Sequence, residues 1–369
     1  MCKLTIFFYD LTLVRTIICL TVFVKRCRFI RSFMGNVTLR MLANALQLST
    51  ATVSKALTNS HEISEKTRQR VLDLAKELNY TPNPYASGLR NKKSRTIAVI
   101  LPEVADSYFA QVIDGVEAVA QEKGYHILIR LTHESCRKEE AILQDLRGGR
   151  ADGILISVSS ETRDSSPIKE LQEKGIPIVF FDRVCEDIDT AKVVTDDFES
   201  ARKATEHLLS RGCKRVALLF ISPDLSISHQ RIEGYKKAMT DHQLSWRESD
   251  IIACTHDPVV NHRILTGLMG GPDAPDGVIA TVEKLVTGIY LACQELRVRI
   301  PGQVKVIGFS NLPSAMLLNP SLTTITQPAF EMGKEAASLL FRELEGKAVR
   351  QKQPLVIPSV LVVRGSTVL

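Results

Sequence analysis

The sequence predicts a small all-α domain followed by a larger α/β body with parallel sheets, and three observations lead to this prediction. Apolar residues recur at helical spacing in three short stretches between residues 37 and 83. Beyond residue 95, apolar and β-branched runs alternate with amphipathic helical stretches. The net charge of the chain is +6, yet residues 36–95 alone carry +6 and the residues after them carry −5. A basic segment joined to an acidic body is typical of a nucleic-acid-binding protein that carries a separate module.

The N-terminal extension, residues 1–36, fits no standard targeting segment. Residues 4–24 are mostly apolar, but two charged residues interrupt them and leave a run far shorter than the roughly 20 residues of a membrane-spanning helix. The basic residues at 25–31 follow the apolar stretch, whereas an export signal carries its positive charges first. Three interpretations stay open: an extension without a function, with Met34 as the natural start, a membrane anchor, or an export signal.

Three helices are predicted in the basic segment. The first covers residues 38–46, and the second, capped by Ser49, covers residues 50–57. The third follows the cap residue Ser64, and its inner face is marked by Val71, Leu72, Ala75 and Leu78. The second helix carries hydroxyl groups and a lysine on its outer side, where a structural helix would carry Leu or Glu. Three helices in about 45 residues, the second polar outside, predict a helix-turn-helix domain over residues 37–83. Residues 84–95 contain proline, small residues and basic residues, and this composition predicts a linker.

The body from residue 96 onward is predicted to contain parallel β-sheets flanked by helices. Strands are predicted at 96–101, 126–131, 153–158, 176–181, 215–220, 277–281 and 304–309. Amphipathic helical stretches such as 109–124 and 198–212 separate them. Two such halves meeting at a cleft would bind a small molecule between the strand ends.

Cysteine spacing and the absence of catalytic motifs argue against a metal site and an enzyme. The eight cysteines form no C-x-x-C pair and have no histidine at zinc-ligand spacing, so they are interpreted as reduced thiols in a cytoplasmic protein. The sequence contains no G-x-x-x-x-G-K-[ST], no H-E-x-x-H and no G-x-S-x-G. We therefore expect no catalytic residue, no cofactor and no bound metal.

Several motifs carry a specific family resemblance. The segment "VTLRMLANALQLSTATVSKALTNSHEISEKTRQRVLDLAKELNYTPNPYASGLR" closely resembles the DNA-binding domain and hinge of the LacI/GalR family of bacterial transcriptional regulators. The similarity continues through "TIAVILPEVADSYF", "QRIEGYKKAM", "KVIGFSNLPSAMLLNPSLTTITQP" and "LVVRGST", so it covers about residues 37–367. In the first domain Gln47 takes the place of the usual turn glycine, and Met41-Leu42 replaces an acidic residue and isoleucine. Gln can adopt the required left-handed conformation at a cost of about 1 kcal/mol.

The resemblance implies a repressor that binds a pseudo-palindromic operator as a homodimer or a higher oligomer. The family pattern assigns base contacts to Thr50, Ala51 and Lys55, at the end of the helix that enters the major groove. Residues 84–95 become a hinge helix in this pattern, and Leu89 takes the position of the leucine that is pushed between base pairs in the minor groove. The predicted DNA-binding residues are Ser49, Thr50, Ala51, Thr52, Ser54, Lys55, Leu89 and Arg90.

The resemblance also implies a two-lobed, periplasmic-binding-protein-like (type I) body with an effector between the lobes. Tyr108 and Phe109 would form a stacking wall, and Arg231 matches the family arginine that binds hydroxyl or carboxylate groups. The predicted effector-binding residues are Asp106, Tyr108, Phe109, Arg183, Asp196, Arg231, Glu283 and Ser310. Ser310 stands where many sugar-binding relatives carry aspartate. A sugar is the favoured effector, and nucleosides, sugar phosphates and acids are the alternatives.

The predicted body covers residues 96–367, with lobe 1 at about 96–196 and 327–350 and lobe 2 at about 197–326 and 351–367. The alternative function is an exported or membrane-anchored sugar-binding protein. That alternative explains two lobes and an apolar N-terminus, but it has no use for residues 37–90.

Overall fold

The computed structural model describes residues 37–81, 93–347 and 353–368. Two units are present, one up to Ser87 and one from Gly88 onward. The predicted N-terminal extension lies outside the described residues, as does most of the hinge, including Leu89 and Arg90. Among the helices of the described part, none is long and apolar enough to cross a bilayer.

The first unit contains the three predicted helices: α2 (Leu39–Leu46), which begins one residue later than predicted, α3 (Thr50–Leu57) and α4 (Glu65–Glu77). The side chains of Thr38, Ser49 and Ser64 cap the three helices in turn. The helices pack around a small core of Leu42, Ala43, Val53, Ala56, Val71 and Ala75. One prediction is wrong: Leu72 is 41% exposed rather than on the inner face.

The turn between α2 and α3 keeps its shape despite the glutamine. Gln47 has φ 57° and ψ 41°, which is the left-handed conformation predicted for it. Its backbone N–H lies 3.3 Å from the carbonyl of Asn44, so it satisfies the C-terminus of α2. Hydrogen bonds at the end of α2 therefore maintain the strained backbone conformation of Gln47.

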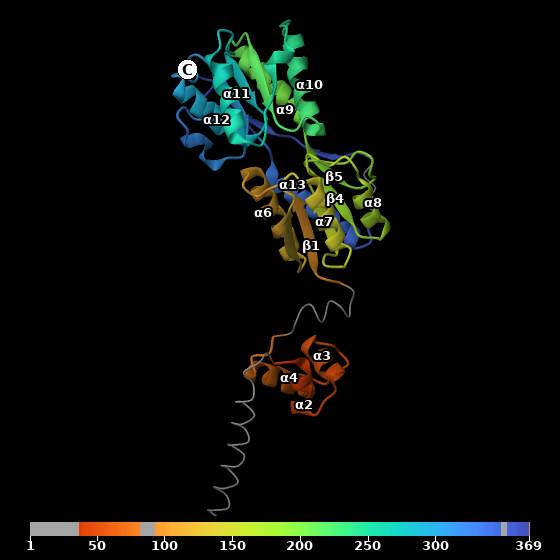
Figure 1. Cartoon of the computed structure of the whole chain (residues 1–369). Helices are drawn as coiled ribbons and strands as arrows, with labels where there is room; N and C mark the ends of the chain where they lie inside the picture. Colours follow the sequence, from red (N-terminus) through yellow and green to blue (C-terminus); the bar gives the residue numbers. More distant parts are fainter. Residues whose placement is uncertain (1–36, 82–92, 348–352, 369) are drawn as a thin grey trace, which may run out of the picture. The chain divides into compact units, whose positions relative to one another are not determined.

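The second unit has two lobes, each built on a six-stranded sheet (Figure 1). The sheet of lobe 1 has the order β11 (Leu355–Ile357), β5 (Lys192–Thr195), β4 (Ile178–Phe181), β3 (Gly153–Ile156), β1 (Thr96–Leu101), β2 (His126–Leu131). The sheet of lobe 2 has the order β12 (Val360–Val362), β10 (Thr323–Thr326), β9 (Lys305–Phe309), β8 (Gly277–Ala280), β6 (Val216–Phe220), β7 (Ile251–Ala253). All neighbouring strands are parallel except β10 and β12. The predicted parallel α/β fold is confirmed.

Helices cover both faces of each sheet. Lobe 1 has α6 (Ser107–Glu122) and α13 (Ala329–Leu344) on one face and α7 (Cys136–Leu146) and α8 (Ser166–Glu173) on the other. Lobe 2 has α9 (Asp197–Ser210) and α10 (Ser226–Asp241) opposite α11 (Pro258–Gly270) and α12 (Glu283–Glu295), as Figure 1 shows. Glycines allow close helix contact: a Cβ on Gly115 of α6 would lie 2.0 Å from the Phe330 carbonyl oxygen of α13.

The chain passes between the lobes three times, after Thr195, after Thr326 and between Ile357 and Val360. The third passage corrects the predicted boundary at residue 351. Leu355–Ile357 forms a parallel ladder with β5 and so belongs to lobe 1, whereas β12 pairs with β10 in lobe 2. The other domain boundaries remain predictions.

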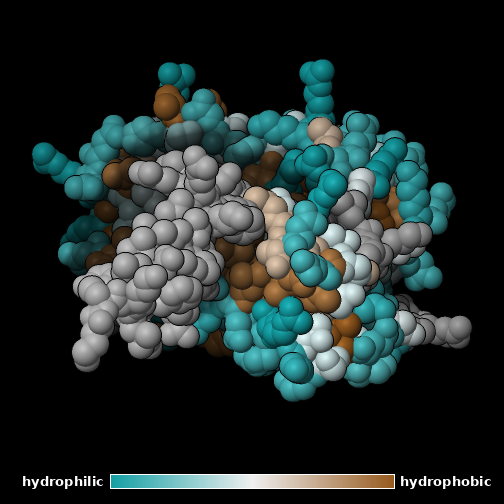
Figure 2. Space-filling view, turned by 90° about the horizontal axis from the view of Figure 1, so that it is seen from below, coloured by the Kyte–Doolittle hydropathy of each residue, from teal (hydrophilic) through white to brown (hydrophobic). Residues whose placement is uncertain are grey.

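Hydrophilic residues cover much of the face seen in Figure 2, and apolar residues interrupt them in small groups. Large apolar side chains that stay exposed in lobe 2 include Val259 and Leu291, on α11 and α12, and Met316 and Leu317, in the 3-10 turn Pro313–Leu317. Scattered exposed apolar residues are normal on a globular protein, but neighbouring ones indicate a contact surface.

Candidate DNA-binding helix and effector cavity

The first turn of α3 faces solvent while its opposite side is buried. Ser49 caps the helix, because its Oγ accepts a hydrogen bond from the Thr52 backbone N–H at 3.0 Å. Thr50 and Ala51 are exposed, whereas Val53 is fully buried in the domain core. The helix therefore presents its N-terminal residues outward on a rigid support, which is the geometry that a base-reading helix requires.

Several polar side chains of α3 have partners within the domain. Lys55 forms an ion pair with Glu62, and their side chains are 41% and 53% exposed. Ion pairs that are this exposed contribute little to the stability of the fold. A guanine or a phosphate could therefore take the place of Glu62 as the partner of Lys55. The hydroxyls of Ser49 and Thr52 lie 2.8 Å apart, and Ser54 is half-buried.

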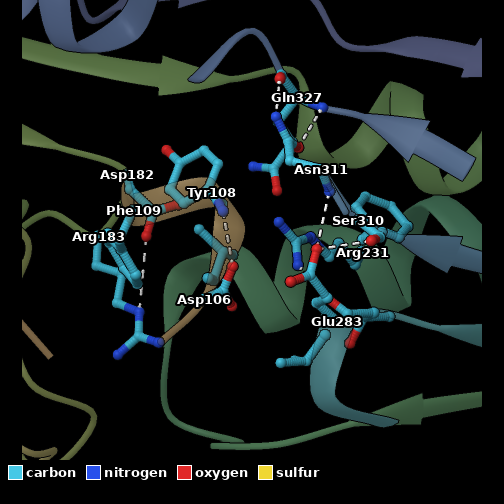
Figure 3. A pocket seen from close by; sticks show the side chains of 14 residues that line it. Asp106, Tyr108, Phe109, Asp182, Arg183, Arg231, Glu283, Ser310, Asn311 and Gln327 are labelled. Carbon is cyan, nitrogen blue, oxygen red and sulfur yellow. Dashed lines mark hydrogen bonds and ion pairs between the residues drawn. The ribbon is translucent and has the colours of Figure 1, made fainter. Parts of the chain in front are cut away.

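A small cavity of about 50 Å³ lies between the two lobes, and residues from both lobes line it. Seven of the eight predicted effector residues meet there (Figure 3): Asp106, Tyr108, Phe109, Arg183, Arg231, Glu283 and Ser310. The cavity is also lined by Asp182, Asn311 and Gln327, which lie at strand ends or in the segments that follow strands. The carboxyl ends of parallel strands thus supply most of this site, as expected for open α/β sheets.

Tyr108 and Phe109 form an aromatic wall on lobe 1. Their ring centroids are 5.2 Å apart in an edge-to-face arrangement, and Phe109 makes a similar contact with Phe181 of β4. The Tyr108 hydroxyl lies 3.2 Å from the sulfur of Met332, and burial raises the pKa of Tyr108 well above its usual value. The wall therefore offers an apolar surface held in place by neighbouring aromatic rings.

Arg231 reaches the cavity from α10 with most of its hydrogen-bonding capacity already used. Its Nε and Nη2 each lie 2.7 Å from one carboxylate oxygen of Asp197, and both side chains are only 6% exposed. A further N–H donates to the Thr281 carbonyl. The guanidinium also stacks over the Phe309 ring, 4.3 Å from its centroid. Arg231 is thus a fixed, charge-balanced part of the lobe 2 wall.

Arg183 is held in a similar way in lobe 1. Its Nη1 lies 2.9 Å from both carboxylate oxygens of Glu134. Burial opposes the charge of Glu134, but the bonds from Arg183 and Ser160 outweigh it and lower the pKa of Glu134. Both arginines that face the cavity are therefore already neutralised by carboxylates of their own lobe.

Glu283 connects the two lobes across the cavity. This first residue of α12 accepts hydrogen bonds from the Ser310 hydroxyl at 2.6 Å and the Asn311 backbone N–H at 3.0 Å, both in lobe 2. It also accepts from the hydroxyl of Ser107 at 2.6 Å and from its backbone N–H at 3.2 Å, at the start of α6 in lobe 1. A carboxylate supplied by α12 thus lies beside the hydroxyl of Ser310.

Further contacts between the lobes surround this bond. The side-chain amide of Asn311 donates to Gln111 at 2.9 Å, and Gln111 donates back to the Asn311 carbonyl at 3.2 Å. Ion pairs join Lys284 to Glu103 and Arg163 to Asp224. The sequence offers Asp106 or Ser107 as a polar neighbour of the aromatic wall, and both lie at the site, but it does not predict Gln111, one helical turn after Ser107. Sequence position alone does not show which residues of that helical turn face the other lobe.

Asp196 does not lie with the other seven predicted effector residues, which corrects the expected grouping. Its carboxylate accepts from the Ser359 backbone N–H at 2.7 Å and the Ser200 hydroxyl at 2.8 Å, and it pairs with Lys203. Successive residues at a helix start point in different directions, so Asp197 and not Asp196 faces Arg231. Asp196 lines an adjoining cavity of about 300 Å³ instead.

Two carboxylates of the first cavity have perturbed acidity. Burial, followed by repulsion from Glu283, raises the pKa of Asp106 to about 6. Burial also raises the pKa of Asp182 to about 6, although Arg183 opposes the shift. Both groups are therefore costly to keep charged in this buried setting.

Comparison with known proteins gives a consistent family assignment. Residues 38–83 match the model for bacterial regulatory proteins of the lacI family, and residues 205–367 match a periplasmic binding protein-like domain. The regulator DegA of Bacillus subtilis is 31% identical over 331 residues, which are 89% of this chain and 98% of DegA. The ribose operon repressor of Halalkalibacterium halodurans is 29% identical over 330 residues, 89% of this chain and 97% of that protein.

Solved structures share the fold. A CelR–cellobiose complex has a TM-score of 0.67 at 26% identity, with 90% of this chain and 100% of that chain covered. The lac repressor dimer bound to operator and an anti-inducer has a TM-score of 0.78 at 23% identity, with 91% and 100% covered. Together with the capped, outward-facing α3 and the cavity between two parallel-sheet lobes, these matches show that the chain belongs to the LacI family of bacterial transcriptional regulators.

Proposed function

We propose that this LacI-family regulator is a repressor whose affinity for operator DNA depends on a small molecule bound between its lobes. The observation that carries this proposal is the convergence of seven predicted effector residues from both lobes on one cavity. A ligand that contacts both walls is sensitive to their separation, so its binding changes the balance between open and closed lobes.

The DNA contacts are proposed from α3 and from the hinge. Thr50, Ala51 and Lys55 contact base edges, and Ser49, Thr52 and Ser54 contact phosphates. Phosphate contacts position the domain, whereas base contacts determine the sequence that it binds. Leu89, followed by Arg90, opens a base step in the minor groove when two hinges meet in the homodimer.

A homodimer is the proposed DNA-binding form. Exposed apolar side chains on α11, α12 and the 3-10 turn Pro313–Leu317 offer lobe 2 a contact surface for a second copy. Two copies of α3 then reach two half-sites of a pseudo-palindromic operator.

The proposed effector is a sugar or a sugar derivative. Relatives include a ribose operon repressor and a structure with bound cellobiose. The aromatic wall of Tyr108 and Phe109 suits the apolar face of a sugar ring, and the carboxylates suit its hydroxyl groups. We propose induction, in which the bound effector weakens operator binding.

Catalysis and export are not part of this proposal. The relatives named above are transcriptional regulators, and the polar groups that face the cavity are arranged for binding. The chain acts in the cytoplasm, where its DNA is found. The exported sugar-binding alternative is set aside, because residues 38–83 match the lacI-family DNA-binding domain.

Capture of genomic fragments by the purified chain, followed by sequencing, tests the proposed function. We expect a pseudo-palindromic site, and log affinity should fall with log salt concentration by about 0.9 per phosphate neutralised. Lys55→Ala should relax the base preference at one position of each half-site. Lys76→Ala, at the far end of α4, is the control and should leave the preferred sequence unchanged. Binding without any sequence preference, or no binding, would exclude the proposed role of α3.

A further inference from the structure

Asp182 is a buried carboxylate at the junction of two cavities. It lines both the cavity with the aromatic wall and the adjoining cavity beside Asp196. The two cavities also share Ile227, so Asp182 and Ile227 lie between the aromatic wall and the space beside α9. A ligand larger than one ring would therefore pass directly by the Asp182 carboxylate.

The Asp182 carboxylate has little compensation from the described residues. The side chain belongs to a residue that is only 6% exposed, and the one hydrogen bond to it comes from the Ser157 hydroxyl at 3.3 Å. The nearest cation is Arg183, whose Nε lies 3.8 Å away and whose Nη1 is bound by Glu134. A buried carboxylate normally has stronger partners than these.

The backbone at Asp182 is also unusual. Its φ is 60°, in the left-handed region that non-glycine residues rarely adopt. Such conformations cluster at ligand sites, where the surrounding structure maintains them. The strand end of β4 is thus bent in a way that keeps this carboxylate at the junction.

The wall of the first cavity leaves negative charge without a matching cation. In the first cavity Asp106, Asp182 and Glu283 stand beside two arginines, Arg183 and Arg231, each of which is already bound by another carboxylate. In the adjoining cavity five acidic side chains line the wall, and four of them already form ion pairs: Glu186 with Lys192, Asp196 with Lys203, Asp197 with Arg231 and Glu199 with Arg202. Asp182 is the fifth, and its nearest cation, Arg183, is 3.8 Å away. An anionic ligand would add to this repulsion, and a cationic group would relieve it.

We propose that the effector is an amine-bearing sugar whose protonated amino group binds Asp182, with a sugar ring against Tyr108 and Phe109. This inference rests on the proposed function of the cavity as an effector site and specifies the charge of its ligand. The ammonium donates to the carboxylate oxygens of Asp182 at the junction, and the hydroxyl groups bond to Asp106 and to Glu283 or its neighbours. Sugar phosphates and sugar acids are disfavoured.

Matched ligands with the full-length chain test the proposal. Glucose, galactose and mannose are each compared with the corresponding 2-amino-2-deoxy sugar and 6-phosphate, by thermal shift and then by calorimetric titration. We expect at least one amino sugar to bind about tenfold or more tightly than its neutral counterpart, as a hydrogen-bonded ion pair predicts, and the phosphates to bind more weakly than either.

Two variants determine whether Asp182 is responsible. Asp182→Asn should abolish the preference for the amino sugar, and its fold should persist because asparagine also adopts the left-handed conformation. Asp241→Asn, an exposed acid on α10 that pairs with Lys237, is the matched control and should retain the preference. Circular dichroism of both variants verifies folding.

Neutral or phosphorylated sugars that bind more tightly than the amino sugars would overturn the inference, as would a panel in which no amino sugar binds. The same protein is assayed for operator binding. A neutral sugar that releases the operator would refute the inference that the effector needs an amino group, while leaving the proposed function intact. Failure to bind any operator would refute the proposed function itself.

Discussion

Replacement of Glu283 by glutamine should loosen the contact between the lobes. Glutamine has the same shape, but its amide nitrogen cannot accept, so it cannot satisfy the donors that surround the carboxylate. Two of these donors, the hydroxyl and the backbone N–H of Ser107, belong to lobe 1. Both reach the same carboxylate oxygen, so glutamine can keep an oxygen there, but a neutral amide oxygen accepts more weakly than a carboxylate. The variant therefore weakens the bond between the lobes without creating a large cavity.

The structure sets the expected magnitude. A hydrogen bond to a charged group contributes about 1.5–3 kcal/mol when it is well buried. Ser107 and Glu283 are only half-buried, so the two bonds together should contribute about 2 kcal/mol at the low end of that range. This corresponds to a shift of about 30-fold in the equilibrium between closed and open lobes.

Hydrogen exchange followed by mass spectrometry measures this shift in the ligand-free protein. Peptides that contain the start of α6 should exchange faster in Glu283→Gln, and Ser107→Ala combined with it should add little, because both remove the same contact. Glu331→Gln, on α13 beside Lys334, is the control and should exchange like the wild type. Unchanged exchange in Glu283→Gln, or full additivity of the two changes, would refute the role of this contact.

Three further predictions concern the hinge, helix packing and pH. Leu89→Ala should weaken operator binding by about 1–3 kcal/mol and remove most of the DNA bend; full bending in a gel-shift phasing assay would contradict this. Gly115→Ala should lower the free energy of unfolding by about 3 kcal/mol, because its Cβ would meet a backbone oxygen at 2.0 Å. Gly267→Ala is the control and should have little effect, because there is open space around this glycine. Equal melting temperatures of the two variants would exclude the packing argument. The raised pKa of Asp182, about 6, means that the folded protein binds this proton more tightly than the unfolded chain does. The stability of the fold should therefore fall as pH rises from about 4 to 6, and Asp182→Asn should raise the melting temperature more at pH 7 than at pH 5. A stabilisation that is equal at both pH values would contradict the assignment.

The sequence predicts the regular elements well where the pattern is local. The runs at 96–101 and 126–131 form β1 and β2 with the predicted boundaries, and the strained turn at Gln47 follows from its position between two helices. Strands β7, β11 and β12 have three residues each, which is too few for an alternating pattern to stand out. Their pairing is set by distant strands, which also explains the error in the boundary at residue 351.

The residues of the cavity, too, could be predicted from the sequence only where their position depends on the local pattern. The loops that follow the strands could be identified, so seven of the predicted residues lie together. Which of two adjacent acids faces Arg231 depends on the rotation at the start of α9, and Asp196 was chosen although Asp197 makes the contact. The bond from Ser107 to Glu283 joins residues 176 positions apart, and the neighbours of either residue in the chain carry no sign of it.

Operator affinity measured with and without the cavity ligand tests the central claim most directly. Fluorescence anisotropy of a captured operator is recorded with wild type and Arg231→Ala, using the tightest ligand of the sugar panel. We predict that the ligand weakens operator binding of the wild type by a coupling free energy of about 1–3 kcal/mol and that operator weakens ligand binding by the same factor. Arg231→Ala should lose the effect, because the buried carboxylate of Asp197 is left without its partner and the lobe 2 wall is disrupted. A ligand that fills the cavity of the wild type and leaves operator affinity unchanged would contradict the account.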